Sequence, residues 1–218
     1  MSPVDICNIA LTLIGDRRIS RLDEDAQLSD PLAQYCATFY DMARRQVLAA
    51  QRWSFAKKAA ALSLRAGATT IGFTYCHVLP NDCVRVMELH KAAGTVDSQT
   101  IYDGKIDCFK IVGREVWTNY SDIAAFYVFD NESPSTWTPH FVAAVAQLLA
   151  HYLAGVVSDN PSASARHLET YERVSLPNAQ FYDAVQDESN ENERDNRNDS
   201  RTLKARYSGN YPYDNEDY

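Results

Sequence analysis

The sequence predicts an α+β fold: a helical bundle of about four helices with an inserted small antiparallel β module and an extended C-terminal tail. Two observations predict it. Apolar residues recur at helical spacing toward both ends of the 218-residue chain, whereas the middle holds short β-branched and aromatic runs separated by Gly, Asn and Asp. We therefore assign residues 1–66 and 133–187 to the bundle, 67–132 to the β module, and 188–218 to an acidic extended or disordered tail.

The first helix is expected to begin at Pro3, because Ser2 can cap it and Asp5 favours the positive end of the helix dipole. Gly15 ends it. The residues 16–29 that follow are expected to form a polar connector. The apolar face of the helix consists of Ile6, Ile9, Leu13 and Ile14.

A second helix is expected to open at Asp30-Pro31. Trp53-Ser54-Phe55-Ala56 either closes it or begins a short continuation to about Leu64. Its apolar stripe consists of Leu32, Tyr35, Cys36, Phe39, Ala43, Val47 and Leu48.

The β module follows Gly67, where the apolar period changes. Hairpin turns are expected at Tyr102-Asp103-Gly104-Lys105 and at Val112-Gly113-Arg114-Glu115. The expected strands are Phe73–Leu79, Val84–Leu89, Ile106–Val112, Glu115–Thr118 and Ile123–Phe129.

Two helices close the bundle. Pro139–Val157 carries no charged side chain and just reaches a membrane-spanning length, but Gln147 and two histidines interrupt it and no Lys or Arg flanks it. We therefore expect a central helix, buried in its own domain or against a neighbouring subunit, and no membrane insertion. A last helix is expected from Pro161 or Ser162 to about Asp187, bent or broken at Pro177.

Composition excludes several classes of protein. The net charge of −8 and the pI near 5.1 argue against a basic nucleic-acid-binding domain and against attachment to anionic lipid by charge. Five Cys without CxxC spacing argue against a secreted disulfide framework and a zinc ribbon. The N-terminus has no basic region before its apolar run, so no signal peptide is expected.

No short catalytic or phosphate-binding motif occurs, and no cofactor is expected. Cysteine and histidine residues gather at Cys76, His77, Cys83 and Cys108, but their spacing fits no common zinc site, and core cysteines are the simpler interpretation. His140 and His151 are too far apart on one helix to share a metal. The acids Asp23-Glu24-Asp25 are interpreted as solvated, and the pairs Trp53–Phe55 and Trp117–Tyr120 as packing residues rather than stacking platforms for nucleic acid.

The acidic excess is concentrated at the C-terminus, where residues 185–218 hold nine acids and five bases. Residues 186–199 contain only Asp, Glu, Ser, Asn, Gln and Arg, which cannot bury enough apolar surface to offset their ordering entropy. Spaced tyrosines follow, and in a segment without a core they favour binding to a partner. The predicted partner-binding arm consists of Arg201, Leu203, Lys204, Arg206, Tyr207, Tyr211, Tyr213 and Tyr218.

Six segments of the chain follow one another in a recognisable order. They are Ile9-Ala10-Leu11-Thr12-Leu13-Ile14-Gly15, Ile19-Ser20-Arg21-Leu22-Asp23-Glu24, Tyr40-Asp41-Met42-Ala43-Arg44, Trp53-Ser54-Phe55-Ala56, Leu79-Pro80-Asn81-Asp82-Cys83-Val84-Arg85-Val86, and the late uncharged helix followed by Tyr171, Ala179 and Asp183-Ala184. Their order resembles bacteriophage head-to-tail adaptor proteins, namely the tail tubular protein A group and related head-completion or packaged-DNA-stabilisation proteins. The match covers roughly residues 3–187.

This resemblance implies a structural protein of the virion neck and not an enzyme. Such proteins form a ring, commonly of twelve copies, that binds the portal protein, docks tail or nozzle proteins and extends the channel for genomic DNA, which passes without sequence-specific binding during ejection. The implied location is the virion, with assembly in the host cytoplasm. An acidic body suits a conduit along which DNA must slide. Subunit–subunit packing is expected along the uncharged helix at Val145, Leu148, Leu149 and Tyr152.

Two other classes of function stay open at this point. The first is an intracellular hydrolase without a recognisable motif that uses Cys83 or Cys36 as its nucleophile, together with a His. The second is a free binding module that is regulated by its acidic tail.

Overall fold

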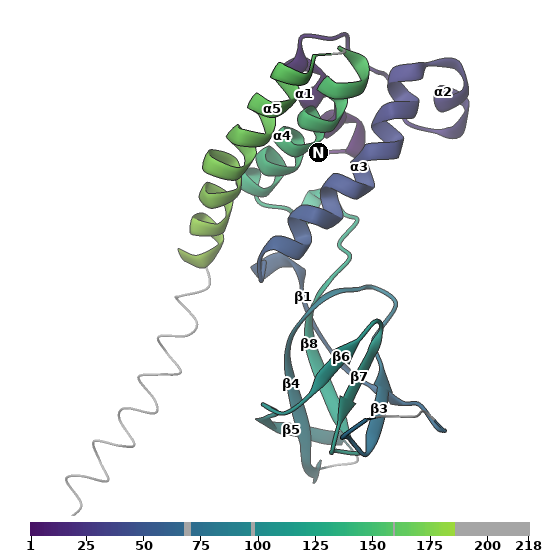
Figure 1. Cartoon of the computed structure of the whole chain (residues 1–218), viewed down its shortest axis with the longest axis vertical. Coiled ribbons are helices and arrows are strands. Elements are labelled where there is room, and N and C mark those ends of the chain that lie inside the picture. Colours follow the sequence, from purple (N-terminus) through teal and green to yellow (C-terminus); the bar gives the residue numbers. More distant parts are fainter. Residues whose placement is uncertain (68–70, 97–98, 159, 186–218) are drawn as a thin grey trace, which may run out of the picture.

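The computed structural model describes residues 1–67, 71–96, 99–158 and 160–185, which form a helical lobe and a β lobe stacked along the long axis (Figure 1). The chain crosses between the lobes twice, once after α3 and once before α4. We call this junction the neck. The helices are α1 (Pro3–Ile14), α2 (Glu24–Ser29), α3 (Pro31–Ala50), α4 (Pro139–Val157) and α5 (Pro161–Thr170).

The predicted fold class is wrong, because the β part is a second lobe rather than a small module. The described residues contain five α-helices and two four-stranded antiparallel sheets, ordered β1-β8-β4-β5 and β2-β3-β7-β6. The β lobe has its own core, which includes Leu89, Val116 and Tyr127. The strands are β1 (Lys57–Ala61), β2 (Ser63–Leu64), β3 (Tyr75–Val78), β4 (Cys83–Val96), β5 (Gln99–Lys105), β6 (Lys110–Val112), β7 (Glu115–Thr118) and β8 (Ile123–Phe129).

The structure differs from local expectation at three places, at two of them because strand pairing overrides local preference. The alanine-rich run 57–64, read as a possible helical continuation, forms β1 and β2 because β1 pairs along β8, with Ala60 opposite Ala125. The expected turn at 102–105 lies inside β5, where Gly104 (φ 76°) is the extra residue of a β-bulge. The connector 16–29 contains α2, which Asp23 caps.

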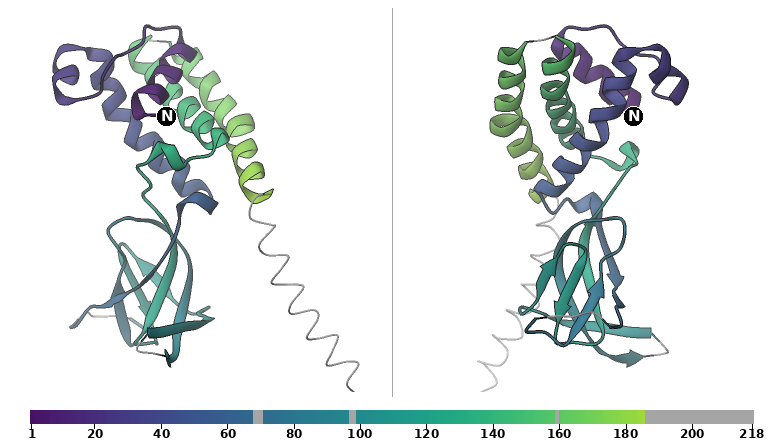
Figure 2. Two further views of the ribbon diagram at one scale, coloured as in Figure 1. Left: turned by 180° about the vertical axis from the view of Figure 1, so that it is seen from behind. Right: turned by 45° about the vertical axis from the view of Figure 1, so that its right-hand side comes forward.

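The helical lobe is built around α4, which packs against α1, α3 and α5 (Figure 2). By length and composition α4 is apolar enough to cross a membrane, but most of it is buried inside the lobe. Its caps follow the sequence: Thr138 accepts a hydrogen bond from the Phe141 amide and Pro139 begins the helix. A core position therefore accounts for its lack of charge.

The last helix does not end or break at Pro177. Residues 176–185 stay helical after a π-helical turn, η3 (Tyr171–Ser175), in which the Leu176 amide donates to the Tyr171 carbonyl. The wider turn gives room to the proline ring, which in a regular α-helix would meet the carbonyl four residues earlier. We call α5, η3 and residues 176–185 together the C-terminal helix.

Candidate functional site

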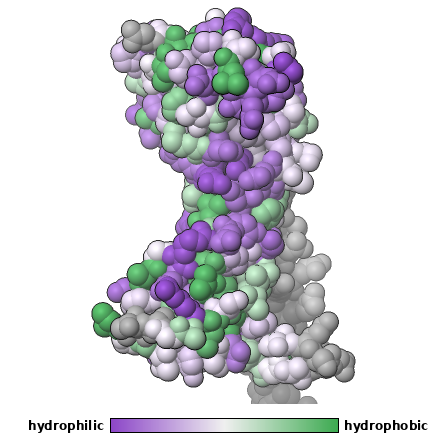
Figure 3. All heavy atoms as spheres, turned by 90° about the vertical axis from the view of Figure 1, so that its right-hand side faces the viewer, coloured by the Kyte–Doolittle hydropathy of each residue, from purple (hydrophilic) through white to green (hydrophobic). Residues whose placement is uncertain are grey.

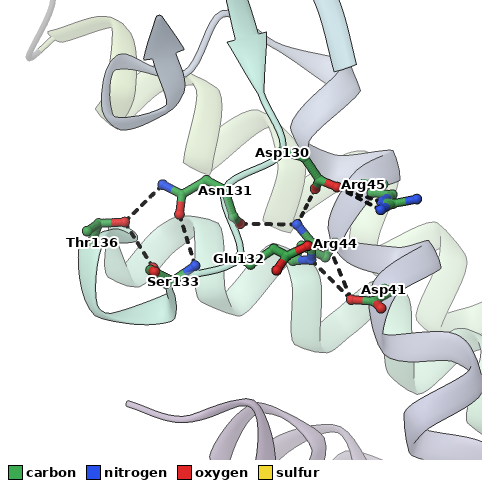
Figure 4. A network of polar contacts seen from close by, with 8 residues as sticks. All are labelled: Asp41, Arg44, Arg45, Asp130, Asn131, Glu132, Ser133 and Thr136. Atoms are coloured by element: carbon green, nitrogen blue, oxygen red, sulfur yellow. Dashed lines mark hydrogen bonds and ion pairs between the residues drawn. The ribbon is translucent and has the colours of Figure 1, made fainter. Parts of the chain in front are cut away.

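The neck is held by a buried charge network (Figure 4). Arg44, on α3, is 1% exposed and lies against Asp130, which follows β8. The same Asp130 accepts a hydrogen bond from Nε of Arg45 at 2.9 Å, and Arg44 also donates to the Asn131 carbonyl at 3.2 Å. One carboxylate thus joins two consecutive arginines of the helical lobe to the chain that leaves the β lobe.

Asn131 extends the network along the second crossing. Its side chain is 3% exposed, accepts from the Ser133 amide at 3.0 Å and donates to the Thr136 hydroxyl at 2.9 Å (Figure 4). Exposed Asp41 and Glu132 add further carboxylates around Arg44. Because buried polar groups are costly unless they are paired, this satisfied network stabilises one arrangement of the two crossings.

The C-terminal helix is tied to the same junction. Asp183, 2% exposed, accepts hydrogen bonds from the amide and the hydroxyl of Ser54, at 3.0 and 2.7 Å. Trp53 beside it is fully buried, and its ring lies 4.9 Å edge-on from Phe141 of α4. Packing, as expected, is the role of Trp53. Segments that are far apart in the sequence therefore meet at the neck.

A polar recess opens at the neck. Hydrophilic residues also gather over the narrow middle of the molecule on the face drawn in Figure 3. Its carboxylates are already paired: Asp82 accepts from Lys58 at 2.7 Å and from the Tyr127 hydroxyl at 3.0 Å. The Lys58 hydrogen bond lowers the pKa of Asp82, which makes this carboxylate a poor general base near neutral pH. The recess is lined by Arg45, Asn81, Asp82, Cys83, Val84, Arg114 and Asp130.

Two exposed apolar surfaces lie on the helical lobe. The first, the C-terminal stripe, consists of Val174, Phe181 and Val185, which are 52%, 63% and 51% exposed and follow helical spacing. The second, the α1 groove, includes the exposed apolar residues Ile9 and Leu13. Its full lining consists of Asp5, Asn8, Ile9, Thr12, Leu13 and Arg18.

These two surfaces lie on different sides of the lobe. The helix α4 packs between α1 and α5, and seen from behind α1 lies toward the viewer while α5 forms the right-hand edge (Figure 2). The sequence showed the apolar face of α1, but not which of its apolar residues the neighbouring elements leave uncovered.

The predicted subunit-packing residues are mostly internal, which corrects that assignment. Val145, Leu148 and Leu149 are fully buried among the helices of their own chain and offer no surface to a second copy. Tyr152 is half-buried, stacks on Phe39 at 5.7 Å and donates to Gln46 at 2.5 Å. The predicted partner-binding arm, residues 201–218, lies outside the described residues.

The candidate nucleophiles and metal ligands are spread apart. Cys36 is fully buried, and burial raises the pKa of the Cys83 thiol, which disfavours the reactive thiolate. His77 is buried and bonds to the Ser121 carbonyl at 3.0 Å. Within residues 1–67, 71–96, 99–158 and 160–185, no group of three or more His, Cys, Asp or Glu is placed to hold a metal ion.

The histidines of α4 serve packing. His140 stacks on Tyr182 with ring centroids 3.9 Å apart, and His151 bonds to the Ser164 carbonyl at 2.9 Å. Both contacts join α4 to the C-terminal helix. Trp117 and Tyr120, the second aromatic pair, each have a lysine above the ring, Lys110 and Lys91 respectively.

Comparison of the sequence with protein-family models and with curated proteins finds no match.

Proposed function

We propose that this protein is a structural virion protein, a subunit of an adaptor ring that connects the portal to the tail and extends the DNA channel. One observation carries the proposal: a single lobe exposes two different apolar surfaces, the C-terminal stripe and the α1 groove, with α4 between them. A closed ring needs two unlike, mutually complementary surfaces on every subunit, whereas a two-fold dimer needs only one. The phage assignment rests on the sequence resemblance.

The neck supports the same function. A ring that bridges two partners must hold its two ends at a constant angle, and the Arg44–Asp130 and Ser54–Asp183 contacts join both crossings and the C-terminal helix at one point. The helical and β lobes then supply two separate ends for the portal protein and for tail or nozzle proteins.

The acidic composition suits a conduit. A net charge of −8 per subunit repels the phosphate backbone, so DNA passes without being retained by counterion release. No sequence-specific contact with DNA is required of any residue in this role.

The test is to mix the full-length protein with the portal protein of the same phage and to measure the mass of the product by light scattering. The expected product is a portal carrying a complete ring of adaptor copies, about twelve. A protein that stays monomeric and joins neither portal nor tail components contradicts the proposal.

A further inference from the structure

One face of the sheet β1-β8-β4-β5 carries more basic than acidic side chains, although the chain as a whole is acidic. Residues directly opposite in antiparallel strands share a face, and so do alternate residues of one strand. Val128 lies opposite both Lys57 and Arg85, Phe126 lies opposite Glu88, and Lys105 lies opposite His90. We call this the cationic face. Its exposed residues are Lys57, Ala59, Ala61, Arg85, Lys105 and Phe126, whereas Glu88 and His90 are half-buried and Ala124 and Val128 are buried.

Positive charge on this face surrounds a single carboxylate. Glu88 contacts Lys105 Nζ at 3.0 Å, His90 Nε2 at 3.3 Å and Arg52, from the end of α3, at 3.7 Å. Arg85 is exposed and donates to the Ala49 carbonyl at 3.2 Å. Lys57 and Arg85 add two further permanent cations to the same face, although the chain as a whole carries −8.

The C-terminal helix ends beside this face. Asp183 binds Ser54, and Lys57 is only three residues further along the chain from Ser54. Val185 follows Asp183 by two residues. Any segment that continues from the helix therefore starts near the neck end of β1, where the cationic face begins.

The segment that continues has the complementary charge. Residues 186–199 hold six acids and two bases and no apolar side chain. Fourteen residues span up to about 45 Å when extended, several times the length of β1. The length, the starting point and the charge of residues 186–199 therefore all match the cationic face.

We propose that the cationic face binds an acidic peptide segment, and that residues 186–199 of the same chain supply it. The carboxylates of the segment form ion pairs with Lys57, Arg85 and Lys105. They also pair with Arg52, which contacts Glu88 from the chain segment between α3 and β1. This contact is a property of the free chain and does not depend on the proposed ring.

The ion pairs between the cationic face and residues 186–199 are weak one by one, but they can form because both partners belong to one chain. Exposed ion pairs contribute only about 0–1 kcal/mol each, so the same peptide added freely would bind weakly. Attached through a short linker, it is present at an effective concentration in the millimolar range. The contact is therefore expected to form at low ionic strength and to weaken as salt screens it.

The experiment is zero-length carbodiimide crosslinking of the full-length protein, mapped by mass spectrometry at about 50 mM and 500 mM NaCl, where screening differs strongly. Crosslinks from the acids of residues 186–199 are expected at Lys57 and Lys105 and to fall at least fivefold at high salt. Lys58, whose partner Tyr127 is buried on the other face, and Lys110 of β6 are the matched control lysines. The Lys58–Asp82 contact serves as an internal reference.

A charge-reversed variant removes the attraction but keeps both reporter lysines. Arg52→Glu with Arg85→Glu is expected to lower the crosslinks at Lys57 and Lys105 at least fivefold. The control, Arg166→Glu with Arg173→Glu on α5 and η3, makes the same change of net charge and is expected to leave them unchanged. Circular dichroism establishes that both variants are folded, and the salt series on the unmodified chain provides the same test without a variant.

Three results would overturn the proposal. The first is crosslinking of residues 186–199 to Lys58 and Lys110 as often as to Lys57 and Lys105. The second is crosslinking unaffected by salt and by charge reversal. The third is an absence of these crosslinks together with binding of short duplex DNA that Arg52→Glu and Arg85→Glu abolish, which assigns the face to nucleic acid instead.

Discussion

Arg44 is the residue on which the neck depends most. A guanidinium at 1% exposure has lost nearly all its water, and its contacts with Asp130, Asp41 and the Asn131 carbonyl replace that hydration. The apolar stripe of the second helix includes the neighbouring Ala43 but gives no sign that Arg44 is buried. Its buried position follows from the chain that returns from β8 and covers it.

Removing the partner of Arg44 is expected to be costly. Asp130→Ala removes the least exposed of the three carboxylates around Arg44, and the exposed Asp41 and Glu132 replace it only in part. The free energy of unfolding should therefore fall by up to about 3–5 kcal/mol. Urea denaturation followed by circular dichroism measures it. The matched control is Arg45→Ala, an exposed partner of the same carboxylate, which should cost about 1 kcal/mol or less. Equal losses in the two variants would mean that Arg44 is not the critical charge.

Glu88 gives a prediction for pH. Its hydrogen bond to Lys105, helped by His90 and Arg52, lowers the pKa of Glu88 from its ordinary value of 4.5. A carboxyl whose pKa is lower in the folded chain stabilises the fold above its unfolded pKa, and this contribution is lost as the pH falls through the folded pKa. Lys105→Met should therefore raise the pKa of Glu88 toward 4.5, as measured by NMR titration of the carboxyl carbon. An unchanged pKa would contradict the contact.

At the scale of elements, β5 depends on a backbone conformation that only glycine adopts easily. Gly104 has φ 76° at a β-bulge, and a Cβ there would lie 2.9 Å from Cε of Lys91. The lysine end can move, so the backbone conformation is the main obstacle to a larger residue.

Gly104→Ala should lower the free energy of unfolding by about 1–2 kcal/mol, the cost of a left-handed conformation for an L-residue. Thermal or urea unfolding measures it. Gly94→Ala in β4 is the control, because its φ is not in the left-handed region and nothing lies within 4 Å of its Cβ, and about 0.5 kcal/mol or less is expected. A Gly104 variant as stable as the Gly94 variant would contradict this interpretation of the bulge.

At the scale of the whole molecule, the relative placement of the two apolar surfaces determines whether copies of the chain form a ring or a dimer. The C-terminal stripe and the α1 groove are separated by α4, so a contact between the stripe of one copy and the groove of the next leaves two surfaces open and continues around a ring. In a two-fold dimer, by contrast, the stripe of each copy would cover the groove of the other, and no apolar surface would stay open for a third copy.

Point charges in each surface distinguish these two arrangements. Phe181→Glu and Leu13→Glu should each abolish the ring, because a carboxylate cannot be buried against an apolar partner. Mixed together, the two variants should form a dimer that stops there, since one intact stripe meets one intact groove. Sedimentation or light scattering measures both states, with Leu28→Glu, an exposed site on α2, as a control that still assembles.

Two other outcomes have clear meanings. If the mixture of variants restores complete rings, the two surfaces do not meet each other. If both single variants assemble normally, the stripe and the groove are not subunit contacts, and the proposed ring uses other faces of the chain.

The sequence by itself determined the features whose causes are local. Ser2 with Pro3 and Thr138 with Pro139 set the starts of α1 and α4, Gly15 ended α1, and β7 and β8 have the predicted bounds, because caps and alternating apolar residues act within a few positions of themselves.

Only the tertiary structure decided the rest. Ala59–Ala61 became a strand because β8 lay beside it, Val145 and Leu149 became core because α1, α3 and α5 surround α4, and Arg44 became buried because a segment 86 residues away covers it. The neck and the exposed surfaces of the candidate site were therefore outside the reach of sequence patterns. Burial and strand pairing depend on which residues distant in the chain meet, and local propensity carries no information about that choice.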